Sequence, residues 1–238
     1  MLQIPIKQQP DETTCGPTCL HTIYEFYQDS IGLHDVIKEV DQLDDGGTIG
    51  ALLGVHALER GYRVSTYSYN LQIFDPTWFG AETPFLIDRL NKQLEYKRTP
   101  KFEIVTKAYV RYLELGGKLL FDDLRPFIIS KYLKRNQPVI AGLSATYLYK
   151  SAREYGHDLE YDDLRGQPTG HFVLLHGYDK ETREVHIADP INQNPLGEGQ
   201  CYKMKIDRVI NAILLGIVTY DANLIIITPQ KRNNIPSL

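Results

Sequence analysis

The sequence predicts an α+β fold in which a helical N-terminal lobe packs on an antiparallel β-sheet C-terminal lobe. Two patterns carry this prediction: apolar residues recur at helical spacing through most of residues 1–137, and short strand-like apolar runs dominate residues 138–238. The 238 residues, 42% of them hydrophobic, suffice for one globular domain with a sizeable core. We therefore expect a single domain over residues 1–238.

The first predicted helix runs from Cys15 to Tyr27, where apolar residues recur every three or four positions. Pro17 is tolerated in its first turn, because the early amides of a helix have no intrahelical acceptor. We expect Thr13 or Thr14 to cap this helix. Cys15 would then lie at the helix N-terminus.

The rest of the helical lobe follows from turn residues and periodicity. A turn at residues 46–48 opens a second helix at 49–60, and a strand follows at 62–67. Helical patterning then covers most of residues 83–135. Breaks are expected at Pro100 and at Gly116-Gly117.

The C-terminal lobe is predicted to be rich in strands, joined by one polar loop. We expect a helix at 206–215, an exposed acidic loop at 151–170, and strands at 139–143, 171–177, 184–189 and 222–228. A loop of this length and polarity commonly covers a functional site.

Composition excludes several classes of protein. The formal net charge of −4 argues against a nucleic-acid partner. The longest apolar runs fall far short of the roughly 20 residues that a membrane span requires. The three cysteines, an odd number, and the absence of a leader-like N-terminus predict a reduced, cytoplasmic protein. The oligomeric state is not predicted.

The segment QQPDETTCGPTCL suggests a nucleophile at Cys15. A helix N-terminus and a neighbouring imidazolium both stabilise a thiolate, which is the reactive form of cysteine. Taken alone, a cysteine is more often a packed apolar residue, and this is what we expect of Cys19, one turn further along the same buried stripe. The setting of Cys15 beside Gly16 and Pro17 favours catalysis.

The segment GHFVLLHGYDKETREVHIADP predicts a β-hairpin that supplies a base. With the turn centred near Lys180, the expected antiparallel register opposes Leu175 to Val185, Val173 to Ile187 and His171 to Asp189. Directly opposed Cβ atoms lie about 4.5–5.5 Å apart, so His171 could bond the Asp189 carboxylate. His176 and His186 would be neighbours on the other face, as solvated or core residues rather than as a metal pair.

Acyl transfer also needs donors for the developing oxyanion. The backbone N–H of Cys15 and a side-chain amide just upstream would serve. Gln9, six positions before Cys15, is the preferred candidate, and Gln8 is the alternative.

Four motifs together resemble the papain-like cysteine peptidases that process double-glycine leaders of bacteriocins, and their stand-alone relatives. They are Q-x5-C-G-P-x-C-L, G-T-I-G-A-L-L with a later R-G-Y, G-H-F-V-L-L-x-G-Y-D, and H-I-A-D-P. The resemblance covers Gln8 to about Pro190, and residues 71–136 match none of these motifs. It implies a papain-like fold in which Cys15 is the nucleophile, His171 the general base, Asp189 the residue that orients the base, and Gln9 the oxyanion donor.

The leading functional hypothesis is a cysteine peptidase or amide hydrolase that acts on a peptide or protein through an acyl-enzyme, with no cofactor and no metal. An acyltransferase or transpeptidase could use the same residues. A non-catalytic peptide-binding module is a second class of function, although all four expected positions are filled. A zinc protein using Cys15, Cys19 and either His21 or Cys201 is a third.

Overall fold

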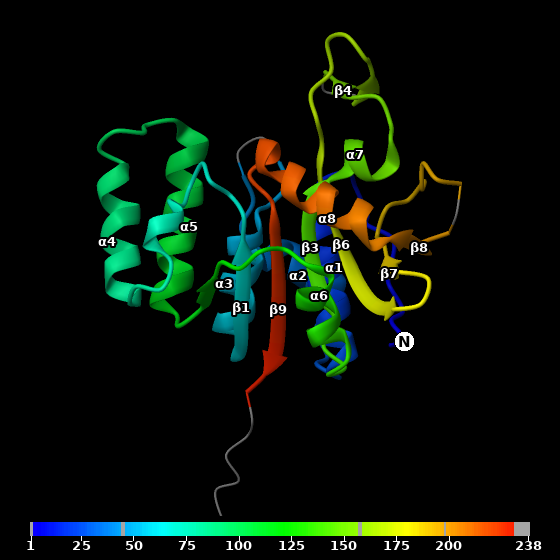
Figure 1. The fold of residues 1–238 in the computed structure, drawn as a ribbon, viewed down its shortest axis with the longest axis horizontal. Coiled ribbons are helices and arrows are strands. Elements are labelled where there is room, and N and C mark those ends of the chain that lie inside the picture. Colours follow the sequence, from blue (N-terminus) through cyan, green and yellow to red (C-terminus); the bar gives the residue numbers. More distant parts are fainter. Residues whose placement is uncertain (1, 44–45, 157–158, 198, 231–238) are drawn as a thin grey trace, which may run out of the picture.

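The computed structural model describes residues 2–43, 46–156, 159–197 and 199–230. Its centre is a seven-stranded sheet of order β2-β1-β9-β3-β6-β7-β8 (Figure 1). All neighbouring pairs are antiparallel except β1 with β2. The strands are β1 (Tyr62–Ser68), β2 (Lys118–Leu120), β3 (Val139–Ser144), β6 (Gly170–Asp179), β7 (Glu184–Ala188), β8 (Cys201–Lys205) and β9 (Asn223–Pro229). The predicted α+β class is confirmed.

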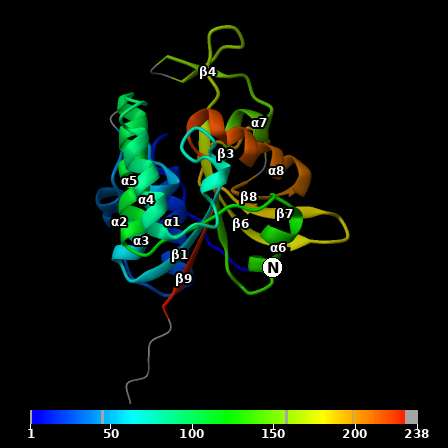
Figure 2. The same cartoon turned by 60° about the vertical axis from the view of Figure 1, so that its left-hand side comes forward.

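Helices cover both faces of this sheet (Figure 2). One face carries α1 (Cys15–Phe26), α2 (Leu33–Glu39), α3 (Gly50–Glu59), α4 (Thr83–Gln93) and α5 (Pro100–Glu114). The other carries α6 (Pro126–Leu133), α7 (Ala145–Tyr149) and α8 (Ile206–Leu215). Two short 3₁₀ turns lie at η1 (Pro76–Trp78) and η2 (Gly216–Thr219). A small hairpin of β4 (Glu154–Tyr155) and β5 (Glu160–Tyr161) projects beyond α7, at the top of Figure 1.

The central strands are apolar on both faces because each face is covered by helices. In β6, Phe172 and Leu174 pack into the cluster formed with α1, α3 and α5, whereas Val173 and Leu175 pack into the cluster formed with α6, α7 and α8. Strand β9 alternates in the same way. The continuous apolar runs in the sequence are therefore two-sided core strands.

Most predicted elements appear within a residue or two of their expected positions. The long helical region is divided into α4, α5 and α6 with β2 between the last two, and α8 has the predicted bounds. Elements that were not predicted are α2, β2, β4, β5, α7, β8 and the two 3₁₀ turns; of these helices, α2 has seven residues and α7 has five. Thr14 occupies the N-cap position of α1, but its side chain makes no capping hydrogen bond, so the predicted cap is wrong.

The predicted register of the β6–β7 hairpin is also wrong. The observed pairs are Leu175 with Ile187 and Tyr178 with Val185, with an irregularity between Leu175 and Gly177. The turn lies closer to Glu184 than was assumed, and a bulge takes up an extra residue. Near Leu175 the shift from the predicted pairing is two residues. An even shift keeps every side chain on its face.

Tyr112 of α5 fastens the sheet edge to the helical layer. Its hydroxyl accepts a hydrogen bond from Thr66 Oγ1 at 3.0 Å and lies 3.0 Å from the carbonyl oxygen of Lys118, to which it donates. The side chain is fully buried. These bonds join α5 to β1 and to β2.

We predict that Tyr112→Phe lowers the free energy of unfolding by about 1–3 kcal/mol, because it leaves buried polar atoms of β1 and β2 without partners. Urea denaturation followed by far-UV circular dichroism measures the change. Tyr96→Phe is the matched control, since Tyr96 is 84% exposed, and it should leave the midpoint unchanged. Equal midpoints for the two variants would contradict this role of Tyr112.

Candidate active site

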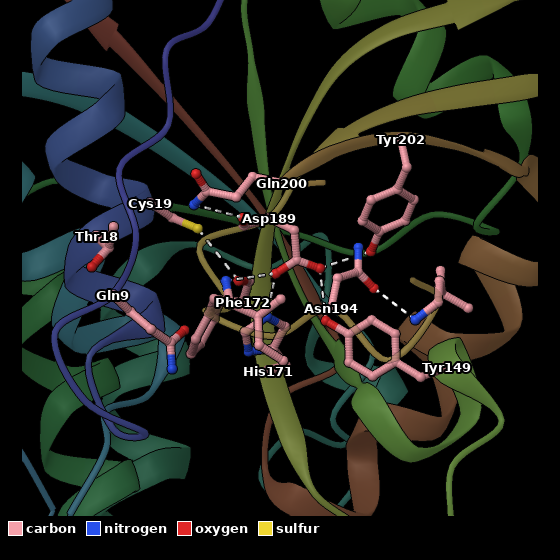
Figure 3. Close-up of polar contacts among 12 residues, drawn as sticks. Gln9, Thr18, Cys19, Tyr149, His171, Phe172, Asp189, Asn194, Gln200 and Tyr202 are labelled. Atoms are coloured by element: carbon pink, nitrogen blue, oxygen red, sulfur yellow. Dashed lines mark hydrogen bonds and ion pairs between the residues drawn. The ribbon is translucent and has the colours of Figure 1, made fainter. Parts of the chain in front are cut away.

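Three elements bring Cys15, His171 and Asp189 together: the start of α1, the start of β6 and the residue after β7. His171 Nε2 lies 2.8 Å from Asp189 Oδ1 (Figure 3). The Cys15 thiol interacts with the same imidazole as a hydrogen-bonding partner. Because Nε2 is engaged by Asp189, Nδ1 is the ring nitrogen left to face the thiol.

The Asp189 carboxylate is completely buried, and its hydrogen-bonding capacity is well satisfied. The hydroxyls of Tyr149 and Tyr202 each donate to Oδ2 at 2.7 Å, and the backbone N–H of Ile191 donates to Oδ1 at 3.1 Å. In Figure 3 both phenols point toward the carboxylate, Tyr202 from above and Tyr149 from below. Neither tyrosine was predicted from the sequence to lie at the site. Tyr149 comes from α7 and Tyr202 from β8, two elements that were not predicted.

Electrostatics favour the charged form of both partners. Burial by itself would lower the pKa of His171, but the charge of Asp189, the Cys15 thiol and the hydrogen bonds to both raise it well above the ordinary value. Burial likewise opposes ionisation of Asp189, yet the charge and hydrogen bond of His171 and the two phenols lower its pKa. The arrangement therefore stabilises an imidazolium beside a carboxylate.

The N-terminus of α1 approaches β6 closely beside Cys15. A Cβ atom on Gly16 would lie 2.7 Å from Thr48 Cγ2 and 3.2 Å from the ring of Phe172, so only glycine fits here. The thiol of Cys15 remains partly exposed, whereas the next helical turn is fully buried. Gly16 thus allows the nucleophile candidate to sit against the strand that carries His171.

Gln9 is buried and held next to the start of α1. Its backbone N–H donates to the carbonyl of Pro190 at 2.8 Å, and its Nε2 donates to the carbonyl of Asp11 at 2.9 Å. The hydroxyl of Thr14 donates to that same carbonyl at 3.2 Å, so the carboxamide lies beside the residue preceding Cys15. An amide nitrogen carries two hydrogens, which leaves a second donor on Nε2. Gln8, the alternative, is exposed.

A cleft of about 350 Å³ opens in front of Cys15. One wall is formed by Gly46-Gly47-Thr48, where both glycines have positive φ angles of 85° and 75°. Glu154 and Leu159 reach the cleft from an arm formed by residues 151–156 and 159–169, which carry β4 and β5. From the sequence, the glycine pair was predicted only as a turn that opens a helix.

The other cysteines and histidines lie outside this arrangement. Cys19 is fully buried, its Sγ donates to the carbonyl of Phe172 at 3.4 Å, and burial raises the pKa of its thiol. His176 and His186 are neighbours, as predicted, with ring centroids 5.9 Å apart. Within the described ranges, no group of three or more His, Cys, Asp or Glu side chains could hold a metal ion. Nor does any described helix have the length and apolarity to span a bilayer.

We predict that Asp189→Asn lowers the free energy of unfolding by about 3–5 kcal/mol, because the buried imidazolium and two phenols lose their anion. The carboxylate contributes stability above the ordinary aspartate pKa of 3.8 and loses it as pH falls through its lowered pKa. His171 contributes below the ordinary histidine pKa of 6.5 and loses its contribution as pH rises through its raised pKa. The difference between variant and wild type should therefore be largest between pH 3.8 and 6.5.

Urea denaturation at a series of pH values measures this difference. Asp207→Asn is the matched control, because Asp207 pairs with Arg183 in an exposed bridge and should change stability by no more than about 1 kcal/mol. A pH-independent difference for Asp189→Asn would contradict the coupling.

Residues 121–209 match the sequence model of the Peptidase_C39 like family. No curated protein matches the chain.

Solved structures with a similar arrangement share little sequence with this chain. A double glycine motif protease from an AMS/PCAT transporter, in complex with the leader peptide, is 13% identical and has a TM-score of 0.45 over 96% of this chain and 93% of that one. The peptidase domain of Streptococcus ComA, a bi-functional ABC transporter involved in a quorum sensing pathway, is 13% identical. Its TM-score is 0.44 over 96% of this chain and 100% of that one. A protein from Bacillus anthracis described as a C39-like peptidase is 16% identical. Its TM-score is 0.43 over 96% of this chain and 96% of that one.

The family match confirms, over the segment that holds His171 and Asp189, the resemblance to C39-type peptidases that the sequence motifs indicated.

Proposed function

We propose that this protein is a cysteine peptidase or amide hydrolase in which Cys15, His171 and Asp189 form a catalytic triad. The observation that carries this proposal is the line of contacts from the Cys15 thiol through the imidazole of His171 to the buried carboxylate of Asp189. The match of residues 121–209 to a peptidase-like family supports it independently. A peptide or protein is the proposed substrate.

In this proposal each side chain of the triad has one role. The raised pKa of His171 favours an imidazolium next to a Cys15 thiolate, and the thiolate attacks the carbonyl carbon of the substrate. His171 Nδ1–H then protonates the amine nitrogen, the C–N bond breaks, and an acyl thioester remains on Cys15. Water attacks this thioester as His171 accepts its proton, and the thiolate leaves. Asp189 holds the ring in one orientation throughout.

Gln9 is the proposed oxyanion donor, together with the backbone N–H of Cys15. Its carboxamide is fixed by the Asp11 carbonyl on one hydrogen and lies beside the α1 N-terminus. A donor fixed before the reaction needs no reorganisation when charge develops on the carbonyl oxygen. This role fits buried Gln9 and does not fit exposed Gln8.

An acyltransferase would use the same residues and differ only in the nucleophile that attacks the thioester. Hydrolysis is the simpler proposal, since the cleft in front of Cys15 is open to water. The cysteines of the described chain are unpaired, so a reducing compartment such as the cytoplasm would keep Cys15 reactive.

We predict that iodoacetamide modifies Cys15 faster than Cys19 or Cys201, because the imidazolium of His171 stabilises the thiolate. His171→Ala should slow this labelling at least tenfold, and peptide mass mapping measures it. His186→Ala is the matched control and should leave the rate unchanged. Equal, slow labelling of all three thiols would contradict the proposed pair.

A second prediction concerns the oxyanion donor. Gln9→Ala should lower kcat about 10²–10³-fold on a fluorogenic peptide amide selected from a library, with little change in KM. Gln8→Ala should retain wild-type kcat because Gln8 is exposed. If Gln8→Ala lost activity and Gln9→Ala kept it, the assignment would be reversed.

A further inference from the structure

A second buried carboxyl group lies in the same cleft and has no part in the proposed chemistry. Asp221, between η2 and β9, is 5% exposed and lines the cleft that contains Cys15. Thr219 Oγ1 donates to its Oδ2 at 3.1 Å. Its Oδ1 is buried without a hydrogen-bond partner in the described part of the chain.

The backbone makes room for this carboxyl directly beside the triad. Gly170 immediately precedes His171, and any side chain at position 170 would collide with Asp221 Oδ2 and Thr219 Oγ1. A Cβ on Gly142, one strand away, would lie 3.2 Å from the Cβ of Asp221. Two glycines therefore let Asp221 pack against β3 and β6 at the end where His171 lies.

An unsatisfied buried carboxyl oxygen is costly unless a ligand completes it. Burial raises the pKa of Asp221 to about 7, although Thr219, Lys101 and His171 each act to lower it. The terminal torsion of an aspartate is broad, so either oxygen can turn toward the cleft. A cationic donor placed there would satisfy the free oxygen and stabilise the ionised form.

The rim of the cleft is also acidic. Glu12 and Glu154 line it and both lie near Tyr161, whose pKa is raised by burial and then by these two carboxylates. Neither forms an ion pair with any described residue. Glu12, Glu154 and Leu159 also line a second hollow of about 570 Å³, so the groove continues past the arm. Lys101 is the only basic residue among the described lining residues.

We propose that Asp221 is a specificity-determining residue, which binds a lysine or arginine side chain of the peptide substrate next to the cleaved bond. Glu12 and Glu154 add a longer-range attraction for the same basic segment. This inference rests on the proposed function of the cleft, because it names the substrate class of the same site. Through Glu154, the arm thereby contributes to substrate selection.

The pH dependence of this selectivity follows from the surroundings of Asp221. The titratable and charged groups that interact with it are Lys101 and Tyr109 on α5 and His171 on β6, and Cys15, Glu12 and Glu154 line the same cleft. Asp221 is neutral below its pKa of about 7 and anionic above it. Preference for a basic side chain should therefore rise as pH increases from 6 to 8.

The experiment compares fluorogenic peptide amides that differ only by lysine or norleucine, placed in turn on each side of the cleaved bond. The ionisation of Cys15 and His171 affects kcat/KM for both substrates equally, so it does not change the ratio of the two values. For the wild type we expect lysine to be favoured at least tenfold at pH 8, with a smaller preference at pH 6. Asp221→Asn should remove the rise with pH and leave only the small, salt-sensitive preference that Glu12 and Glu154 supply.

Three further variants separate specific binding from general effects. Thr219→Val removes a hydrogen bond that lowers the pKa of Asp221, so the midpoint of the pH-dependent preference should move upward. Glu154→Gln should reduce the lysine preference about two- to threefold, and more at low salt than at high salt. Glu181→Gln, in the exposed turn at the opposite end of β6, is the charge-matched control and should change nothing.

If no variant hydrolyses the peptides, their binding to the Cys15→Ala variant tests the role of Asp221 instead. Fluorescence anisotropy with the same peptides should then show the lysine preference, its rise with pH, and its loss in Cys15→Ala/Asp221→Asn. Loss of hydrolysis with this discrimination intact would overturn the proposed function alone. A wild-type protein without lysine preference, or an Asp221→Asn variant that keeps the full preference and its rise with pH, would overturn the assignment of Asp221.

Discussion

The buried carboxylate of Asp189 is the constraint on which the site depends. An ionised carboxyl group with no exposed surface is stable only when donors and a positive charge surround it. Here two phenols, one backbone amide and the His171 ring supply them, from α7, β8, the segment after β7 and β6. One side chain therefore fixes the relative positions of four segments, and the imidazole takes its orientation from that arrangement.

The site also joins the two sides of the sheet. Tyr149 and Tyr202 belong to the core cluster beneath α6, α7 and α8, whereas Cys15 packs on the cluster beneath α1, α3 and α5. His171 lies at the end of β6 and contacts partners from both sides. Packing errors in either layer would thus displace one partner of the imidazole.

Two buried aspartates near one histidine have opposite electrostatic environments. Asp189 is hydrogen-bonded by the His171 imidazole and several other donors, and its pKa is lowered. Asp221 receives one hydroxyl, and burial raises its pKa to about 7. The number of donors around each carboxyl explains the difference, since burial acts on both in the same direction. One carboxylate is thereby suited to hold a cationic ring and the other to respond to a ligand.

The sequence by itself determined the fold class, most helices and strands, and the residues that meet at the site. Periodicity and turn residues are local signals, so α1, α3, β3 and α8 could be predicted from short windows. The short elements α2, α7 and β8 could not, because tertiary packing decides them. The hairpin register was predicted wrongly because a pattern of apolar residues does not reveal a bulge. His171 and Asp189 are still close to each other, because a shift of two residues near Leu175 leaves both side chains on the same face.

Only the tertiary structure decided which groups complete the site. Tyr149 and Tyr202 meet Asp189 from elements 40 and 13 residues away along the chain, and no local pattern marks such long-range hydrogen bonds. The choice of Gln9 over Gln8 likewise depends on burial against Pro190. The position of Asp221 depends on the absence of a side chain at Gly170, 51 residues earlier in the sequence. Sequence specifies reactive residue types at local spacing, whereas the environment that sets their charge arises from contacts between distant segments.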